Sequence, residues 1–427
     1  MKLMSLRNHN LRFIIACVLL LSFFALTSGA QQKPESSPKP KVRAITAFVI
    51  LERARYQIQI SETVHFLKYA QTVFESRGYT VETLRIATQP FPEYTKSLSR
   101  DEVLQFFKNL DGLAQQDHFI LSIGPAYLSG ENGDAQADLL AEILQNTKSI
   151  SGTIFVTKDD NVNWLAVKAA ARVIKKLADS TPRSEGNFRF AALASVPPYS
   201  PFFPAAYHTG TGHQFTVGLE SANTVAAAFQ DAPDIPTARR HLLDLFIQQS
   251  FDVEELALRA DREQGWTYLG LDLSPASAKD ASIGAAIEAL SHQPIGTSGT
   301  LTAVATITST FKDIGARKAG YSGLMLPILE DPRLAERWNN GLISLDALLS
   351  YSAVCGTGLD TIPLPGDTSV DALARIIGDV ASLSVKWNKP LSARLLPVAG
   401  KHAGDQTEFI APNVLNVTIQ PLAAAAR

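Results

Sequence analysis

Short apolar runs of strand length recur along the chain and are separated by amphipathic segments. Runs with the composition of strands lie at residues 44–51, 80–86, 119–123, 153–157, 190–195, 215–219, 267–273, 324–329, 360–364 and 393–398. Between most of them, apolar residues recur at helical spacing, as in residues 61–76 and 163–178. This alternation predicts an α/β fold of about ten strands. Several runs are apolar on both faces, so we expect the strands to be covered on both sides.

Two local signals predict where helices begin. Ser99 and Glu102 have the spacing of a capping box ahead of an apolar helical pattern. Asp331 is followed by Pro332, which is typical of an N-cap residue with proline at the first helical position.

Residues 1–30 have the pattern of a secretory signal. A basic start with Lys2, Arg7 and Arg12 precedes an apolar run at residues 13–26, and small residues end the segment. The run is shorter than the roughly 20 apolar residues of a spanning helix, which favours a cleaved signal over an uncleaved membrane anchor. We therefore expect export to a periplasm or the outside, and no membrane span after cleavage.

The rest of the chain divides into a spacer and a folded part. Residues 31–42 are polar and rich in proline, which predicts an extended spacer. Residues 43–427 contain no stretch that resembles an interdomain linker, so we expect a single α/β domain. Two tightly packed halves that meet near residues 180–190 are the alternative.

Charge and cysteine content narrow the function classes. Among 427 residues, 39 are Lys or Arg and 41 are Asp or Glu, for a net charge of −2. This balance provides no basic field for nucleic acid, so we expect no nucleic-acid partner. Cys355 is the only cysteine after the predicted signal, which excludes an intramolecular disulfide framework.

The chain lacks the familiar catalytic signatures. It contains no HExxH, GxSxG, P-loop or CxxC motif. The pairs Gly210/Gly212 and Gly356/Gly358 are only half of a dinucleotide fingerprint, so we expect no nucleotide cofactor. The histidines show no metal-ligand spacing, and the metal question stays open, with a divalent ion compatible with the carboxylates described next.

Loops after the predicted strands hold side chains suited to chemistry, because α/β proteins bind ligands at such loops. The proline-rich loop 197–208 ends in Tyr207, a candidate ligand contact, and His208, a candidate general base. Glu220, just beyond the next strand, is a second candidate base. The alternative is a rigid packed loop with a hydrogen-bonded histidine.

Carboxylates interrupt or flank the later strands. Asp272 interrupts an apolar run, where a carboxylate must be paired, hydrogen-bonded or bound to a cation. Glu330 stands at a predicted strand end and Asp360 at a strand start. We expect these three to act as acid, base or divalent-cation ligands, with a structural role as the alternative.

The glycine-rich segment after Cys355 is the last candidate. Cys355 can act as a nucleophile if its thiolate is stabilised, although a buried, inert thiol is the alternative. We expect polar and backbone groups around this segment and the 400–405 turn to bind an anionic ligand. These ligand-binding candidates are Gly356, Gly358, Gly366, Asp367 and Lys401.

The same loops carry a family resemblance. PYSPFFPAAYH, GLDLSPA, LPILEDP, CGTGLDTIPLPGDT and LPVAGKHAGD resemble the domain-of-unknown-function family 711, also called uncharacterised protein family 0210. The resemblance covers about residues 43–410 and implies a ten-stranded α/β barrel similar to that of the glycyl-radical enzymes, with helices outside. It also implies that Cys355 lies on a loop threading the barrel.

The resemblance does not imply radical chemistry. The R-V-x-G-Y type glycyl-radical motif is absent, and residues 316–321 only echo it far from the C-terminus. The family has no assigned reaction to carry over. The predicted signal is a further departure, because relatives look cytoplasmic.

Two function classes remain open, and both use a small-molecule partner. The first is an exported enzyme, of hydrolase or lyase class, that acts on a small polar or anionic metabolite through acid/base residues. The second is a non-catalytic protein that binds such a ligand. A structural or protein-interaction role is a third reading, and the sequence leaves a homo-oligomer open.

Overall fold

The computed structural model describes residues 39–126, 133–277 and 281–422. The predicted signal at residues 1–30 and the spacer up to residue 38 lie outside the described residues.

The described part of the chain is built on one large sheet. Its strands are β1 (Lys41–Val49), β2 (Leu84–Thr88), β3 (Phe119–Pro125), β4 (Ile150–Phe155), β7 (Phe190–Ala194), β8 (Gln214–Glu220), β9 (Thr267–Asp272), β10 (Gly358–Pro365) and β11 (Leu391–Val398). Their order is β10-β11-β7-β4-β3-β2-β1-β8-β9. A separate hairpin consists of β5 (Thr157–Lys158) and β6 (Asn161–Val162).

The strand directions divide the sheet into three groups. The five central strands β1, β2, β3, β4 and β7 are parallel. The pair β8 and β9 joins β1 in the antiparallel sense, and the pair β10 and β11 joins β7 in the same way. Each outer pair is parallel internally. The sheet is therefore mostly parallel, which is typical of α/β proteins.

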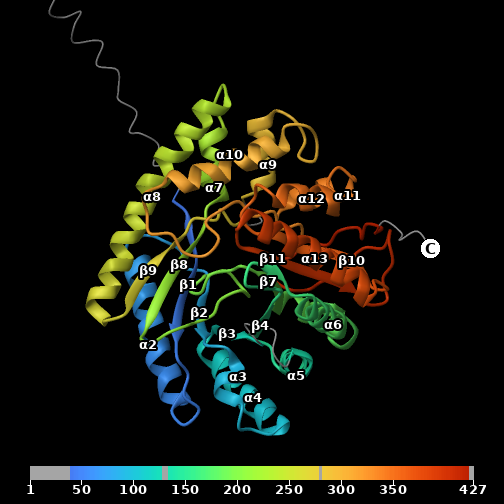
Figure 1. The fold of residues 1–427 in the computed structure, drawn as a ribbon. Helices are drawn as coiled ribbons and strands as arrows, with labels where there is room; N and C mark the ends of the chain where they lie inside the picture. The colour runs from blue at the N-terminus through green and yellow to red at the C-terminus, as the bar shows by residue number, and fades with distance from the viewer. Residues whose placement is uncertain (1–38, 127–132, 278–280, 423–427) are drawn as a thin grey trace, which may run out of the picture. The chain divides into compact units, whose positions relative to one another are not determined.

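Helices surround the strands (Figure 1). They are α2 (Tyr56–Glu75), α3 (Phe91–Thr95), α4 (Arg100–Asp117), α5 (Gly133–Gln145), α6 (Trp164–Ser180), the 3₁₀ helix η1 (Pro182–Arg189), α7 (Ala222–Phe229), α8 (Ile235–Gln264), α9 (Ile283–Ser291), α10 (Thr300–Asp313), α11 (Pro332–Asn339), α12 (Leu345–Ser352) and α13 (Val370–Trp387). Helix α2 packs on β1, α4 on β3, α5 on β4 and α13 on β11. Every residue of β2, β4, β7, β10 and β11 is buried, so these strands are covered on both faces.

Both predicted helix starts are confirmed. The Ser99 side chain accepts a hydrogen bond from the Glu102 amide, and the Glu102 carboxylate accepts one from the Ser99 amide. Asp331 caps α11 by accepting hydrogen bonds from the Arg333 and Leu334 amides. Such caps satisfy amides that the first helical turn leaves unpaired.

The strand predicted at residues 324–329 does not form. Pro327 has no N–H for a ladder, and the chain turns at once, because the Glu330 amide donates to the Pro327 carbonyl at 3.2 Å. Only one bridge remains, between Pro327 and Asp360. The predicted α/β class is confirmed, but the described residues form a nine-stranded sheet rather than ten strands, and no ladder joins β9 to β10 among them.

The loop between β7 and β8, residues 195–213, folds back over one face of the sheet. We call it the inner loop. The Tyr199 amide donates to the Tyr207 carbonyl at 3.0 Å, which closes the loop on itself. The Tyr199 ring packs edge-on against Phe48 of β1, and Ser122 of β3 donates to a loop carbonyl. This inner loop therefore carries its tip, residues 201–203, across the central strands.

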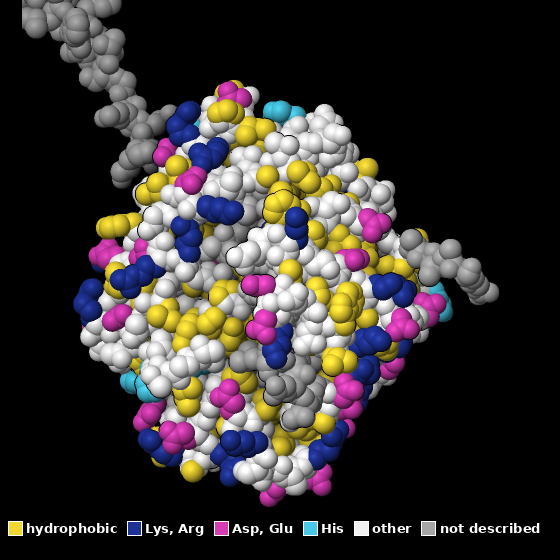
Figure 2. All heavy atoms as spheres, in the orientation of Figure 1, with side chains coloured by type: hydrophobic (Ala, Val, Ile, Leu, Met, Phe, Trp, Pro, Cys, Tyr) yellow, Lys and Arg dark blue, Asp and Glu magenta, His cyan; other side chains and the backbone are white. Residues whose placement is uncertain are grey.

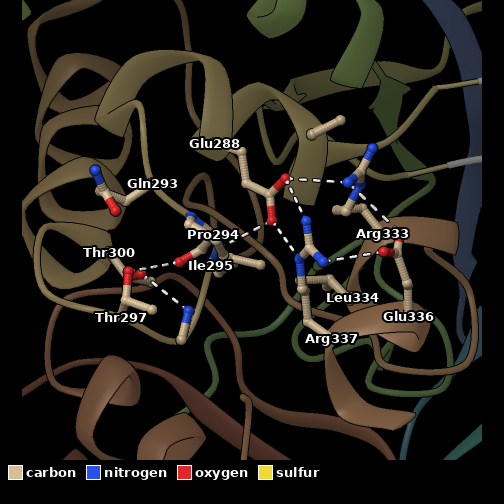
Figure 3. Close-up of polar contacts among 12 residues, drawn as sticks. Glu288, Gln293, Pro294, Ile295, Thr297, Thr300, Arg333, Leu334, Glu336 and Arg337 are labelled. Atoms are coloured by element: carbon tan, nitrogen blue, oxygen red, sulfur yellow. Dashed lines mark hydrogen bonds and ion pairs between the residues drawn. The ribbon is translucent and has the colours of Figure 1, made fainter. Parts of the chain in front are cut away.

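Charged side chains join α9 to α11 (Figure 3). The Glu288 carboxylate accepts hydrogen bonds from Arg337 Nε at 2.7 Å and Nη2 at 3.1 Å. It also lies 3.3 Å from Arg333 Nη1 and accepts the Ile295 amide at 3.0 Å. Arg337 Nη1 reaches Glu336 at 2.9 Å. We call Glu288, Arg333, Glu336 and Arg337 the helix clamp.

Candidate functional site

Side chains from distant positions in the strand order meet at one pocket. Its lining includes Arg43 of β1, Arg85 of β2, Asp272 of β9, Asp360 of β10 and Arg394 of β11. Strands β9 and β10 are the two ends of the order, so the sheet curls until both ends face one space. The interior volume is about 100 Å³, several times the ~10–15 Å³ that one water needs. We call this space the arginine pocket.

Arg85 is buried without a carboxylate partner. Its Nη1 donates to the Pro201 carbonyl at 2.7 Å and its Nε to Thr83 Oγ1 at 3.2 Å. Its Cζ lies 5.3 Å from the centre of the Phe203 ring. In the described residues, Nη2 has no hydrogen-bond partner and the guanidinium makes no ion pair. Since an isolated buried charge is costly, this cation lacks an anion that a ligand can supply.

The charges around Arg85 reinforce this positive character. Burial, followed by the charges of Arg43 and Arg394, lowers the pKa of Arg85 to about 9. Glu330 and Glu82 act in the opposite sense with smaller effect. The side chains nearest Arg85 thus leave a site that favours an anion.

Arg394 faces the carboxylates of the pocket. Its Nη1 lies 2.7 Å from Asp360 Oδ1 and 3.4 Å from Glu330 Oε1, and its Cζ lies 5.9 Å from the Phe202 ring centre. Burial opposes the charged form of Arg394, but Asp360 and Glu330 raise its pKa above the ordinary value. Burial raises the pKa of the Asp360 carboxyl despite this partner. The Nε of Arg394 is buried with no partner among the described residues.

Arg43 connects the pocket to a second carboxylate pair. It stands at a break in register between β1 and β8, where a bulge redirects the chain. Its Nη1 lies 3.0 Å from both Glu82 and Glu220, and its Nη2 lies 3.6 Å from Glu330. Lys41 lies 3.0 Å from Glu220. Burial and the adjacent Glu82 raise the pKa of Glu220 to about 7.

Asp272 is fully hydrogen-bonded within the protein. Its Oδ1 accepts from the Ser274 amide and hydroxyl and from the Ser322 amide, and its Oδ2 accepts from the Tyr321 amide. Burial raises its pKa although these bonds favour the charged form. Gly320 has φ +62°, and a Cβ there would lie 2.1 Å from Oδ2. Asp272 therefore fixes the 320–322 turn beside the pocket.

The structure brings together some of the residues that the sequence predicts to be catalytic. Asp272, Glu330 and Asp360 line the arginine pocket, and Glu220 is linked to it through Arg43. Their chemical roles stay predictions, because geometry alone assigns none.

The predicted histidine and tyrosine lie on the inner loop, and neither lines the arginine pocket. His208 is buried, and its Nε2 pairs with Gln214 Oε1 at 2.8 Å. Burial lowers the pKa of His208. The Tyr207 hydroxyl donates to the Val196 carbonyl at 3.0 Å. These contacts fit the packed-loop alternative that the sequence left open.

Cys355 and Gly356 line a second cavity instead. Cys355 is buried, and its Sγ accepts the Gly358 amide at 3.5 Å. A Cβ on Gly356 would approach the Gly323 backbone within 2.4 Å. The glycines here allow two backbone segments to meet, which is a structural use.

The remaining predicted residues lie beyond the C-terminal ends of β10 and β11. The Gly366 amide donates to the Lys401 carbonyl at 2.8 Å, and Lys401 Nζ pairs with Glu408 at 2.6 Å. Asp367 lies 3.6 Å from His402. None of these residues lines the arginine pocket, which the other predicted segments reach through Phe202, Asp272, Glu330 and Asp360.

Sequence reasoning missed the arginines and the two phenylalanines at the loop tip. Arg43 and Arg85 stand near the starts of parallel strands, whereas the sequence search examined loops after strands. Arg394 could have been selected from the sequence, because it is a single charged residue inside an apolar run, as Asp272 is. Phe202 and Phe203 lay in a loop already selected, where only Tyr207 and His208 were chosen.

Two further findings concern metal and membrane. Within the described ranges, no group of three or more His, Cys, Asp or Glu side chains is arranged to hold a metal ion. No helix in the same ranges combines the length and hydropathy needed to cross a bilayer.

Fold and pocket together define an α/β protein with a curled, mostly parallel sheet around an arginine–carboxylate site. The model of the family described as Uncharacterised ACR (DUF711) matches residues 36–414. The UPF0210 protein of Pyrobaculum islandicum is 31% identical over 348 residues, which cover 77% of this chain and 76% of the relative. That of Pyrobaculum arsenaticum is 30% identical over 356 residues, with 79% and 78% covered. That of Desulforudis audaxviator is 29% identical over 358 residues, with 78% and 77% covered.

The chain therefore belongs to the DUF711 family, as the loop sequences indicate. The family description and the names of these relatives state no function.

Proposed function

We propose that the arginine pocket binds a small molecule that carries an anionic group, and that pocket carboxyls exchange protons with it. The observation that carries the proposal is Arg85, a buried guanidinium in the pocket wall with no carboxylate partner among the described residues. A carboxylate or phosphate of a ligand would supply the missing charge and accept the free Nη2 donor.

The acid/base part of the proposal rests on Asp360 and Glu330. Both line the pocket and share Arg394, and burial raises the pKa of Asp360. A carboxyl with a raised pKa holds and returns a proton more readily at neutral pH. This arrangement supports a hydrolase or lyase class of reaction without selecting between them.

Binding without turnover is the second candidate function, and the pairing of the carboxylates favours it. Asp272 is fully hydrogen-bonded, and Asp360 and Glu330 are both engaged by Arg394. A site whose acids are already paired can hold a ligand without a free base.

The first experiment measures anion binding by thermal unfolding of the purified chain. Malonate is the probe, and malonamide, its neutral isostere, is the control. We expect malonate to raise the melting temperature of the wild type and malonamide to leave it unchanged. In Arg85→Met the malonate effect should disappear, whereas Arg172→Met, a change at an exposed arginine on α6, should retain it. Equal stabilisation by malonate and malonamide would refute an anion site.

The second experiment separates turnover from binding. Small carboxylic acids with exchangeable carbon-bound hydrogens are incubated with the protein in D₂O and followed by NMR. Deuterium incorporation that is lost in Asp360→Asn supports proton exchange by the pocket. Ligand that binds but is recovered without deuterium or other change supports the binding role.

Two finer readings accompany the proposal. We infer that the curled sheet is a barrel interrupted at residues 317–328, since single bridges join this segment to Leu271 of β9 and Asp360 of β10.

We also infer export, from residues 1–30 alone. Cell fractionation and N-terminal sequencing test it, because an intact N-terminus in the cytoplasmic fraction would refute a cleaved signal.

A further inference from the structure

A second cavity, distinct from the arginine pocket, has walls of a single charge sign. It measures about 770 Å³ and is lined by Lys312, Lys318 and Lys389, with no Asp or Glu among its lining residues. The chain as a whole is slightly acidic, at −2. On the face seen in Figure 2, both signs of charge are interspersed. The wall of the cavity therefore differs in charge from the mixed surface around it.

Two of these lysines are held in place by backbone carbonyls. Lys389 Nζ donates to the carbonyls of Ser352, Ala353 and Cys355, where α12 ends. Lys318 Nζ donates to the carbonyls of Lys312 and Ile314, where α10 ends. Helix C-termini attract cations, and anchored side chains lose less conformational freedom when a ligand arrives. The charges are thus positioned before any ligand binds, and Lys389, whose three N–H donors are taken by carbonyls, acts through its charge alone.

Two of the lysines also act on each other. Lys389 is half-buried, and burial lowers its pKa. Cys355 opposes this effect, and the charge of Lys312 adds to it as the smallest of the three causes. Like charges that approach each other around a cavity are relieved by an anion placed between them.

We propose that this lysine cavity, defined by Lys312, Lys318 and Lys389, is a second binding site, for a small molecule that carries phosphate groups. The size of the cavity and its number of cations fit a multiply charged anion better than a single carboxylate. This site does not depend on the function proposed for the arginine pocket. The two spaces do share a wall, because Tyr321 and Ser322 line the lysine cavity and donate their amides to Asp272 of the arginine pocket.

The test titrates the purified chain with pyrophosphate by isothermal calorimetry, at constant ionic strength maintained with chloride. We expect saturable binding that persists, at one site per chain, in Arg85→Met, in which the arginine pocket lacks its unpaired cation. Lys312→Glu should weaken it by roughly tenfold or more, the effect of losing one charge-assisted contact and adding a repulsive one. Lys312→Arg keeps the charge and should retain the affinity. Lys312 is exposed, so these variants should fold.

Two further variants separate the lysine cavity from the rest of the molecule. Lys108→Glu makes the same charge change on the exposed face of α4 and should leave affinity unchanged. Arg85→Met should also leave it unchanged. Loss of pyrophosphate binding in Arg85→Met would assign it to the arginine pocket and overturn the proposal. Equal affinity in wild type and Lys312→Glu, or no saturable binding, would overturn it as well.

Trp387 offers an independent readout. It lines the cavity with 57% of its surface exposed. Pyrophosphate should change the intrinsic fluorescence of the wild type, and Trp387→Phe should lose this change while calorimetry still detects binding. A fluorescence change that persists in Trp387→Phe would place the anion elsewhere.

Discussion

The arginine pocket and the helix clamp use the same residue types in opposite ways. In the clamp, Glu288 is bound by Arg337 through two nitrogens and lies 3.3 Å from Arg333. In the pocket, Arg85 is more deeply buried than either clamp arginine and yet has no carboxylate among the described residues. A complete ion-pair set stabilises the fold, whereas an incomplete one beside a cavity leaves a place for a ligand.

The two regions also differ in the direction of their pKa shifts. Burial alone would raise the pKa of Glu288, but Arg337 and the Ile295 amide hold it below the ordinary value. In the pocket region, Asp272, Asp360 and Glu220 all have raised pKa values, with burial as the largest cause. Carboxyls whose pKa is lowered by a partner thus belong to the clamp, and carboxyls whose pKa is raised by burial belong to the pocket region.

Removal of Arg394 should give the largest effect on stability. Arg394→Met leaves Asp360 buried without its cation, and we expect the free energy of unfolding at neutral pH to fall by about 3–5 kcal/mol. Urea denaturation measures it. Arg85→Met is the matched variant, since it removes a buried arginine that pairs with no carboxylate, and should cost far less stability while abolishing malonate binding.

The double variant Arg394→Met/Asp360→Leu sharpens this prediction. If the loss comes from an unpaired charge, removing both partners should restore much of the stability. A double variant as unstable as Arg394→Met would show that packing of the long side chain, rather than its charge, is responsible.

Glu220 should make stability depend on pH in the opposite sense to the clamp. Its pKa is raised from 4.5 to about 7 in the folded state. A raised pKa means that folding favours the protonated form, so this contribution is fully present below pH 4.5 and is lost as the pH rises through about 7. Glu220→Gln should flatten this decline, by about 2 kcal/mol between the two limits after allowance for solvent screening.

The measurement is the free energy of unfolding across that pH range for both proteins. Glu288→Gln is the control, because the lowered pKa of Glu288 gives stability that is present above its unfolded pKa and lost as the pH falls through the folded value. Identical pH profiles for the wild type and Glu220→Gln would contradict the prediction.

The contrast between these regions also shows what the sequence could predict. Local signals were sufficient for the α/β class, the cap at Ser99 and the cap at Asp331, because each depends on neighbours in the chain. The prediction of a strand at residues 324–329 was wrong because it rested on apolar composition and ignored Pro327, which cannot donate a hydrogen bond to a ladder.

The candidate site was harder to predict for a geometric reason. Asp272, Glu330 and Asp360 were selected as isolated carboxylates, and they do line one pocket. Arg43 and Arg85 were missed because they approach it from the starts of strands, in a sheet whose curling the sequence pattern does not encode. The rule that ligands bind after parallel strands selected Gly366, Asp367 and Lys401, which lie at the other ends of β10 and β11.

A break in the helix clamp should give a moderate and purely structural effect. Arg337→Met removes two of the hydrogen bonds to Glu288, and we expect a loss of about 1–2 kcal/mol, since the pair is partly exposed. Malonate should stabilise this variant by the same amount as the wild type. A changed malonate response would mean that the clamp and the pocket are coupled, and their separation would fail.

Lys401→Ala should give the smallest effect, and it tests which cation meets the ligand. The sequence selects Lys401 as an anion contact, but its ammonium pairs with the exposed Glu408 and does not line the arginine pocket. Exposed pairs contribute little, so we expect a stability change within about 0.5 kcal/mol. Malonate affinity should match the wild type, in contrast to Arg85→Met. A Lys401→Ala variant that loses malonate binding would place the anion site at the C-terminal ends of β10 and β11 rather than at Arg85.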